Sequence, residues 1–249
     1  KANMVLVFVI EVALFSGAYG AEIYLQYFDR ISVVQKKRNL PALISNLESL
    51  LASPEKFYPI PLIRPDIVPP AQGIRHSIFT LDGNEILPLA GISNVPTVFC
   101  AEARDSFLTY NSDRYGFNNH DSVWDLATID VAALGDSFTH GTCVEPNEHM
   151  VGIIRNKLPV TLNLGRLGTG PLSQLAILRE YLAPKKPKSV IWFLEESNDI
   201  WGDLHDELKI AILRKYLDPG YSQDLSSKQP QVDGLLKDVY ADKIESEVL

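Results

Sequence analysis

The chain has 249 residues, of which 46% are hydrophobic and 22% are charged, as is ordinary for a globular protein with a buried core. Its formal net charge is −8, which argues against nucleic-acid binding because that function needs clustered Lys and Arg. The one basic cluster, Lys36–Arg38, is short, and a solvated helix end accounts for it.

An apolar segment, Met4–Gly20, lies near the start of the chain and is interrupted only by Glu11 and Ser16. Its length is at the lower limit for a membrane span. We therefore expect residues 1–28 to form a membrane anchor or signal-anchor helix, with the rest of the chain outside the cytoplasm. A cleaved signal peptide and a buried core helix are the alternatives that this pattern leaves open.

The next region, residues 29–125, is predicted to be a helical linker followed by a proline-rich accessory segment. Leucine and isoleucine recur at helical spacing in Asn39–Leu51. Proline is dense in the stretch that follows, and it interrupts helices and central strands. We expect an extended strap over residues 53–72 and short irregular strands over residues 74–98, with a hairpin turn at Asp82–Asn84.

Residues 126–249 alternate short apolar runs with longer stretches in which apolar residues recur every three or four positions. This alternation predicts an α/β fold with a parallel sheet covered by helices on both faces. The expected strands are 129–134, 160–164 and 189–194, the last of them buried. The expected helices are 147–158, 171–182 and 203–217, followed by a core-facing helical stripe from Val232 to Ile244.

Polar and glycine-rich sequences follow each of the three predicted strands. Gly135-Asp136-Ser137 follows the first, Asn163–Gly170 covers the end of the second and the turn after it, and Asn198 follows the third. The carboxyl ends of parallel strands meet at one edge of a sheet, where crevices bind ligands. A purely structural reading also accounts for each segment, because such residues form turns, cap helices and allow close packing.

Together these segments resemble the conserved blocks of the SGNH or GDSL hydrolases. Gly135–Phe138 matches the first block, Gly168 the second-block glycine, and Glu196–Asp199 the third block, with glutamate where the family usually has glycine. The resemblance covers about residues 108–249, and the lead-in Tyr110–Asn119 is similar to that of membrane-anchored bacterial members. It implies a three-layer α/β/α, flavodoxin-like fold, incomplete at its C-terminus.

The resemblance also implies residue roles. Ser137 would be the nucleophile, and the backbone N–H groups of Ser137 and Gly168 would form an oxyanion hole with the Asn198 side-chain amide. Asp136 and Asp199 would support these groups. No metal site or cofactor is expected.

The family's catalytic base lies in a late Asp-x-x-His block, and this chain contains no such motif. His140 is too close in sequence to Ser137 for a usual base, so we expect it on the surface or in a loop, and we place His205 near a helix start. We expect the chain to be part of a longer protein, and to be inactive or nearly so without the base.

The leading hypothesis is a serine esterase acting on acyl esters, O-acetyl groups foremost, of carbohydrate or a related substrate outside the cytoplasm. An O-acyltransferase and a non-catalytic carbohydrate-binding or assembly module on the same scaffold are the alternatives. The sequence gives less support to a third hypothesis, a Rossmann- or flavodoxin-like cofactor-binding domain, because no Gly-x-Gly-x-x-Gly follows the first strand. The chain's two cysteines, Cys100 and Cys143, are expected to form a disulfide.

Overall fold

The computed structural model describes residues 78–100, 107–183 and 185–248, together with residues 19, 24, 45–46, 49–50, 53 and 56–59. Most of the predicted anchor and strap, and Lys36–Arg38, lie outside the described residues. No helix in the described part of the chain is long and apolar enough to span a bilayer.

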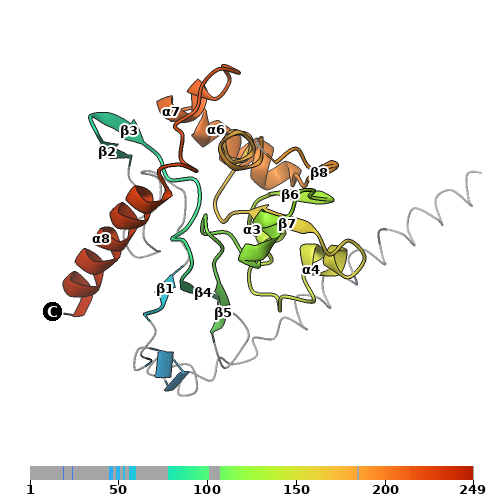
Figure 1. Ribbon diagram of the computed structural model, residues 1–249, viewed down its shortest axis with the longest axis horizontal. Coiled ribbons are helices and arrows are strands. Elements are labelled where there is room, and N and C mark those ends of the chain that lie inside the picture. Colours follow the sequence, from blue (N-terminus) through green and yellow to red (C-terminus); the bar gives the residue numbers. More distant parts are fainter. Residues whose placement is uncertain are drawn as a thin grey trace, which may run out of the picture.

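The chain has a mixed α/β fold around a three-stranded parallel sheet in the order β7-β6-β8 (Figure 1). In this sheet Val131 pairs with Thr161 on one side and with Ser189 on the other, so all three strands end at the same edge. The central strand and β7 are fully buried, and the buried residues of β7 include the polar Thr161 and Asn163. The strands are β6 (Val131–Gly135), β7 (Thr161–Gly165) and β8 (Ser189–Trp192).

Helices follow each strand, as the alternating pattern predicted. The predicted helix at 171–182 is confirmed, and its last turn widens into a π-helix. The helix expected from residue 147 begins only at Met150, because His149 caps it by accepting the N–H of Gly152. The bounds are α3 (Ser137–His140), α4 (Met150–Arg155), α5 (Pro171–Ile177), η3 (Leu178–Leu182), η4 (Glu196–Asp203), α6 (Leu204–Glu207), α7 (Ala211–Lys215) and α8 (Gln229–Val248).

The accessory segment forms a small mixed sheet and a hairpin. The predicted turn is confirmed: Asp82 and Gly83, both with positive φ, connect two antiparallel strands. A 3₁₀ turn then leads to the parallel sheet. The elements are β1 (Tyr58–Pro59), β4 (Pro96–Cys100) and β5 (Leu108–Asn111) in the order β1-β4-β5, the hairpin β2 (Phe79–Leu81) and β3 (Asn84–Ile86), and the turn η2 (Asp121–Asp125).

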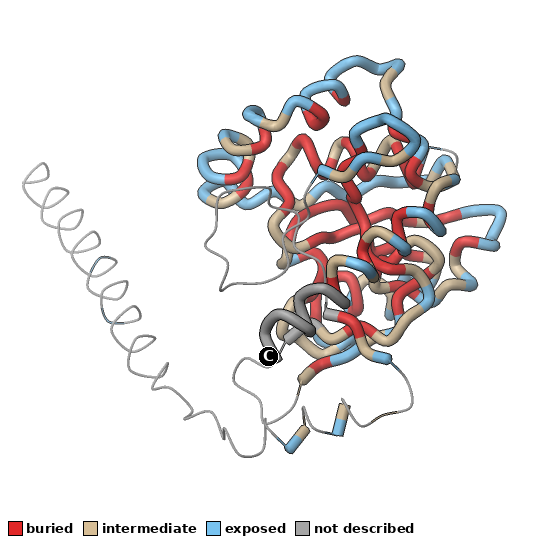
Figure 2. The backbone as a smooth tube through the Cα atoms, turned by 90° about the vertical axis from the view of Figure 1, so that its left-hand side faces the viewer, coloured by how far each residue is buried: buried red, intermediate tan, exposed pale blue. Residues whose placement is uncertain are grey.

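One hydrophobic core joins the accessory segment to the parallel sheet. Leu87 and Leu89 belong to the same buried cluster as Leu134 and Leu162. The helix α8 completes this core as predicted, because Val232, Leu236 and Tyr240 are buried, and Tyr240 contacts Tyr58 of β1 with ring centroids 6.0 Å apart. Figure 2 shows the buried backbone at the centre of the molecule and the exposed segments around it.

The prediction that residues 189–194 form a buried strand was wrong. All four residues of β8 are exposed, including Trp192 at 41%, and Leu194 beyond it is exposed as well. Within the described chain, β8 pairs only with β6, so it is an edge strand and its apolar side chains face solvent. A run of apolar residues shows strand propensity and cannot show what covers the strand.

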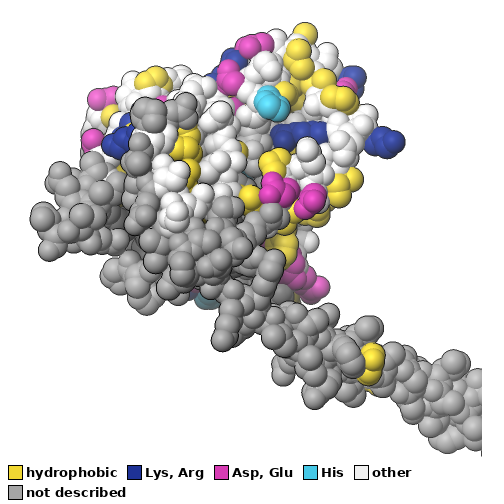
Figure 3. Space-filling model, turned by 90° about the horizontal axis from the view of Figure 1, so that it is seen from below, with side chains coloured by type: hydrophobic (Ala, Val, Ile, Leu, Met, Phe, Trp, Pro, Cys, Tyr) yellow, Lys and Arg dark blue, Asp and Glu magenta, His cyan; other side chains and the backbone are white. Residues whose placement is uncertain are grey.

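Figure 3 shows another face of the molecule, on which charged groups of both signs lie among hydrophobic ones. In the coloured part of this face, Lys and Arg do not gather into one continuous basic patch.

Candidate functional site

The turn between β6 and α3 requires glycine at its first position. Gly135 has a φ of +155°, and a Cβ there would lie 2.1 Å from Thr139 Oγ1 and 2.9 Å from the Phe193 carbonyl oxygen. A side chain would therefore push apart the turn and the end of β8. The close approach places residues 136–138 against the ends of the neighbouring strands.

Asp136 connects the ends of β6 and β8. Its buried carboxylate caps α3, because Oδ1 accepts the Phe138 N–H at 2.9 Å. The other oxygen, Oδ2, accepts a hydrogen bond from Nδ2 of Asn198 at 3.0 Å. The structure thus brings the third predicted block into direct contact with the residue that precedes Ser137.

Ser137 is the first residue of α3 and is half-buried, while the next residue, Phe138, is 63% exposed. Within the described part of the chain, no side chain hydrogen-bonds to the Ser137 hydroxyl. The hydroxyl is therefore reachable from solvent, and no described histidine activates it.

Gly168 lies in the loop between β7 and α5 with a φ of +67°, a conformation that favours glycine. The loop is attached to the end of β6, because the Arg166 N–H donates to the Gly135 carbonyl at 3.1 Å. Its far end is held by Glu207, whose carboxylate accepts the N–H groups of Gly170 and Leu172 at 2.8 Å each. These contacts place the Gly168 loop beside the turn that carries Ser137.

Asn198 lies in η4, a π-helical segment, a type of turn that is frequent at functional sites. Its backbone N–H donates to Glu195, and one N–H of its side-chain amide donates to Asp136. A primary amide has two N–H groups, so one remains for a ligand. Asn198 is half-buried.

Asp199 holds the start of η4 in place through hydrogen bonds. This fully buried carboxylate accepts the Glu195 N–H at 2.7 Å and an N–H of Gln174 at 3.3 Å. Burial raises its pKa, and the nearby charges of Asp136 and Asp203 raise it further. Gln174 in turn accepts the Trp192 indole N–H at 2.5 Å. No local sequence pattern indicates the role of Gln174, because its partners lie on other elements.

His140 is buried, so the prediction that it lies on the surface or in a loop was wrong. It ends the short helix α3, its ring packs against that of Tyr110 with centroids 5.5 Å apart, and its Nδ1 lies 3.3 Å from Thr142 Oγ1. Burial lowers its pKa from 6.5 to about 3, and the charge of Arg166 acts in the same direction. His205 lies in α6, near the helix start as predicted.

This buried histidine makes stability depend on pH. The unfolded chain protonates His140 near pH 6.5 and the folded chain only near pH 3, so its contribution is complete above pH 6.5 and is lost as the pH falls. Between pH 6.5 and about pH 3, we expect this difference in His140 protonation to lower the free energy of unfolding by about 1.4 kcal/mol for each unit that the pH falls. Urea unfolding of His140→Gln at pH 7 and pH 5 should show a weaker pH dependence than wild type. His205→Gln, at an exposed histidine, is the matched control, and equal slopes for His140→Gln and wild type would contradict the assignment.

The cysteine after α3 takes part in a disulfide: Cys143 is disulfide-bonded and has a φ of +66°. The chain's other cysteine is Cys100, at the end of β4. Its side chain lies outside the described part, so the Cys100–Cys143 pairing remains a prediction. A bond at Cys143 constrains the loop that follows the candidate nucleophile.

Comparisons with protein-family models, curated proteins and solved structures returned no match for this chain. Its function is therefore inferred from the site itself. Direct hydrogen bonds link the turn at Ser137 to Asn198 and to the loop of Gly168.

Proposed function

We propose that this protein is a serine esterase of the SGNH or GDSL class, with the three-layer, flavodoxin-like arrangement of that class. The observation that supports this most is the hydrogen bond from the Asn198 amide to Asp136. It joins the segments that resemble the first and third family blocks, which are 62 positions apart. A chance Gly-Asp-Ser turn would not require an asparagine from another strand end beside it.

In the proposed reaction, the Ser137 hydroxyl attacks an ester carbonyl and an acyl-enzyme forms as the alcohol leaves. The backbone N–H groups of Ser137 and Gly168 and the free amide N–H of Asn198 stabilise the negative oxygen of the tetrahedral intermediate. Water then releases the acid and regenerates Ser137. The base that takes the serine proton would be a histidine of the late block, which this chain does not contain.

The substrates we propose are acyl esters on carbohydrate outside the cytoplasm. The disulfide at Cys143 supports this location, because such bonds persist mainly in oxidising compartments. An O-acyltransferase would use the same site with a sugar hydroxyl in place of water. Glu196, at a position where the family usually has glycine, favours a second candidate, a non-catalytic carbohydrate-binding or assembly module on the same scaffold.

Substitution of Asn198 tests the proposed esterase activity. In the full natural polypeptide, we expect Asn198→Ala to lower kcat for p-nitrophenyl acetate by roughly 10²–10³-fold, because an oxyanion-hole donor acts in the transition state. Asn198→Asp replaces a donor with an acceptor beside Asp136 and should lose at least as much. Asn147→Ala, at an exposed asparagine away from the turn, is the control. Wild-type kcat in both Asn198 variants would contradict the role of Asn198 in the site.

A further inference from the structure

Gln174 is a fully buried polar residue of α5. Its neighbours on the same helix, Leu172 and Ala176, belong to the hydrophobic core. A primary amide in such surroundings is unfavourable unless its donors and its acceptor are hydrogen-bonded. The side chain of Gln174 therefore needs partners outside its own helix.

The Gln174 side chain finds these partners on three other segments. Its Nε2 donates to the Thr169 carbonyl oxygen at 2.9 Å and to Asp199 Oδ1 at 3.3 Å, which uses both of its N–H groups. Its Oε1 accepts the Trp192 indole N–H at 2.5 Å. Gln174 thus joins the Gly168 loop, η4 and β8.

The bond to Thr169 holds the loop that carries Gly168. Thr169 directly follows Gly168, and its hydroxyl donates to the Arg166 carbonyl oxygen at 2.7 Å, which closes the loop on itself. Gln174 holds the Thr169 carbonyl from the side of α5. Because Gly168 lies between these anchored residues, the direction of its N–H depends on them.

The bond to Asp199 holds the segment that carries Asn198. Asp199 directly follows Asn198, and its Oδ2 accepts the Glu195 N–H while its Oδ1 accepts from Gln174. Burial raises the pKa of Asp199, and the hydrogen bond from Gln174 counteracts that rise. Without Gln174, this buried carboxyl group would lose a donor that stabilises its charged form.

The three segments of the candidate site are joined in a closed ring. The Asn198 amide bonds to Asp136 in the turn of Ser137, and the loop of Gly168 bonds to the start of the same turn. Gln174 supplies the third link, between the Gly168 loop and η4. One amide therefore connects the two segments that carry the proposed oxyanion-hole donors.

We propose that Gln174 is a positioning residue that sets the separation of these two donors, the Gly168 N–H and the Asn198 amide. This inference rests on the proposed esterase function, and Gln174 itself touches no reacting atom. An oxyanion hole works when its donors converge on one oxygen, and a misplacement of about 1 Å can cost roughly 10²-fold in rate. Because Gln174 holds both segments, its loss frees both donors at once.

The kinetics of Gln174→Met in the full natural polypeptide test this role. The substitution keeps the length of the side chain and removes its hydrogen bonds. We expect kcat for p-nitrophenyl acetate to fall roughly 10–100-fold while KM stays within about twofold, because the donors act in the transition state. Gln231→Met, the same change at an exposed residue of α8, should keep wild-type values of both constants. Gln174→Glu keeps an acceptor for Trp192 and loses the N–H donors, so it should behave like Gln174→Met and replaces it if that variant does not fold.

A double-mutant cycle separates positioning from general destabilisation. Where Asn198 is already alanine, one of the donors that Gln174 positions is gone. We therefore expect Gln174→Met to lower kcat in that background by less than about threefold. A change that only reduced the folded fraction would lower kcat by the same factor in both backgrounds. Circular dichroism and thermal unfolding verify that each variant folds.

Amide hydrogen exchange gives a second measurement, which needs no activity. In Gln174→Met, we expect exchange of Gly168–Gly170 and of Glu196–Asp199 to become faster together, by about tenfold or more, because both segments lose the same anchor. Exchange in β6, which Gln174 does not contact through a hydrogen bond, should stay as in wild type.

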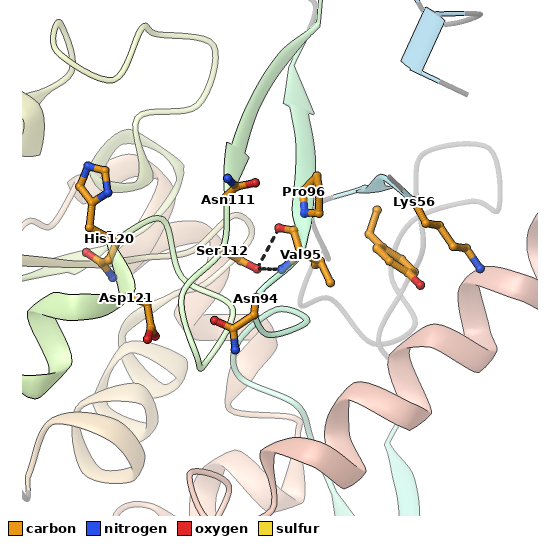
Figure 4. A pocket seen from close by; sticks show the side chains of 10 residues that line it. Lys56, Asn94, Val95, Pro96, Asn111, Ser112, His120 and Asp121 are labelled. Atoms are coloured by element: carbon orange, nitrogen blue, oxygen red, sulfur yellow. Dashed lines mark hydrogen bonds between the residues drawn. The ribbon is translucent and has the colours of Figure 1, made fainter. Parts of the chain in front are cut away.

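A cavity elsewhere in the molecule supplies a further control. It has a volume of about 630 Å³ and lies between the β1-β4-β5 sheet and the start of η2 (Figure 4). Ser137, Gly168, Gln174 and Asn198 do not line it. Asn111, which stands on a strand beside the cavity in Figure 4, is exposed. Asn111→Ala should therefore leave exchange in both segments unchanged.

Two results would overturn the inference. One is unchanged exchange in either segment of a folded Gln174 variant. The other is an equal loss of kcat in the wild-type and Asn198→Ala backgrounds. A wild-type protein without esterase activity would overturn the proposed function instead, and hydrogen exchange would still decide whether Gln174 holds the two segments together.

Discussion

Replacing Ser137 with alanine is expected to lower hydrolysis of p-nitrophenyl acetate by roughly 10⁴-fold or more in the full natural polypeptide. The substitution removes the atom that forms the acyl-enzyme. The same variant should lose covalent labelling by a fluorophosphonate probe, which reacts with activated serines.

The control for this experiment is Ser122→Ala. Ser122 is exposed in η2 and lies away from the ends of the parallel strands, so both hydrolysis and labelling should stay at wild-type levels. Undiminished labelling of Ser137→Ala would place the nucleophile elsewhere. A folded wild-type protein that neither hydrolyses esters nor reacts with the probe would favour the non-catalytic module.

Gly116→Ala is expected to destabilise the protein by roughly 3–5 kcal/mol, or to prevent folding. Gly116 has a φ of +87°, and a Cβ there would lie 2.2 Å from the carbonyl carbon of Gly91. The obstacle is backbone on both sides, so no side-chain rotation relieves it. Two loops cross at this point, and one of them continues into Phe117 and Asn119, which bond to the buried Asp113.

Urea unfolding measures this effect, with Gly234→Ala as the control. Gly234 lies in α8, and a methyl group added there would meet no heavy atom within 4 Å, so this substitution should stabilise the protein by up to about 1 kcal/mol. Insoluble Gly116→Ala protein, or a strongly lowered unfolding midpoint, agrees with the expectation. A midpoint equal to that of wild type would show that the loops can separate without cost.

The parts of the fold that were predictable are those with a local signal. A continuous apolar run marked β6, because a strand buried on both faces needs no polar residues, whereas β7 contains the buried polar residues Thr161 and Asn163. Pro171 marked the start of α5, since proline is well placed in the first turn of a helix. Asp82-Gly83 marked the hairpin for a similar reason, because both residues tolerate positive φ.

The parts that were missed depend on distant partners. The helix expected over 203–217 divides into α6 and α7, with Ile210 in an extended conformation between them. At the end of α6, Glu207 turns inward to bind the N-terminus of α5, and nothing in its own neighbourhood of the sequence indicates that role. The exposure of β8 and the burial of His140 likewise depend on what the rest of the chain places beside them.

In the candidate site, too, some residues have a local sequence signal and others depend on distant partners. Ser137, Gly168 and Asn198 could be selected because each follows a predicted strand, and parallel strands bring their ends together. The groups that fix them, Gln174 and Glu207, could not be selected, because their bonds cross between separate helices. A sequence pattern locates the edge of the sheet where chemistry is expected, and only coordinates reveal how its loops are held.

The edge strand β8 has a consequence for the behaviour of the protein in solution. It presents Val190, Ile191 and Trp192 to water, and within the described chain its outward backbone groups have no strand beside them. Sheet edges of this kind are templates on which further polypeptide can add. We therefore expect that, where molecules associate in concentrated samples, they do so first along β8.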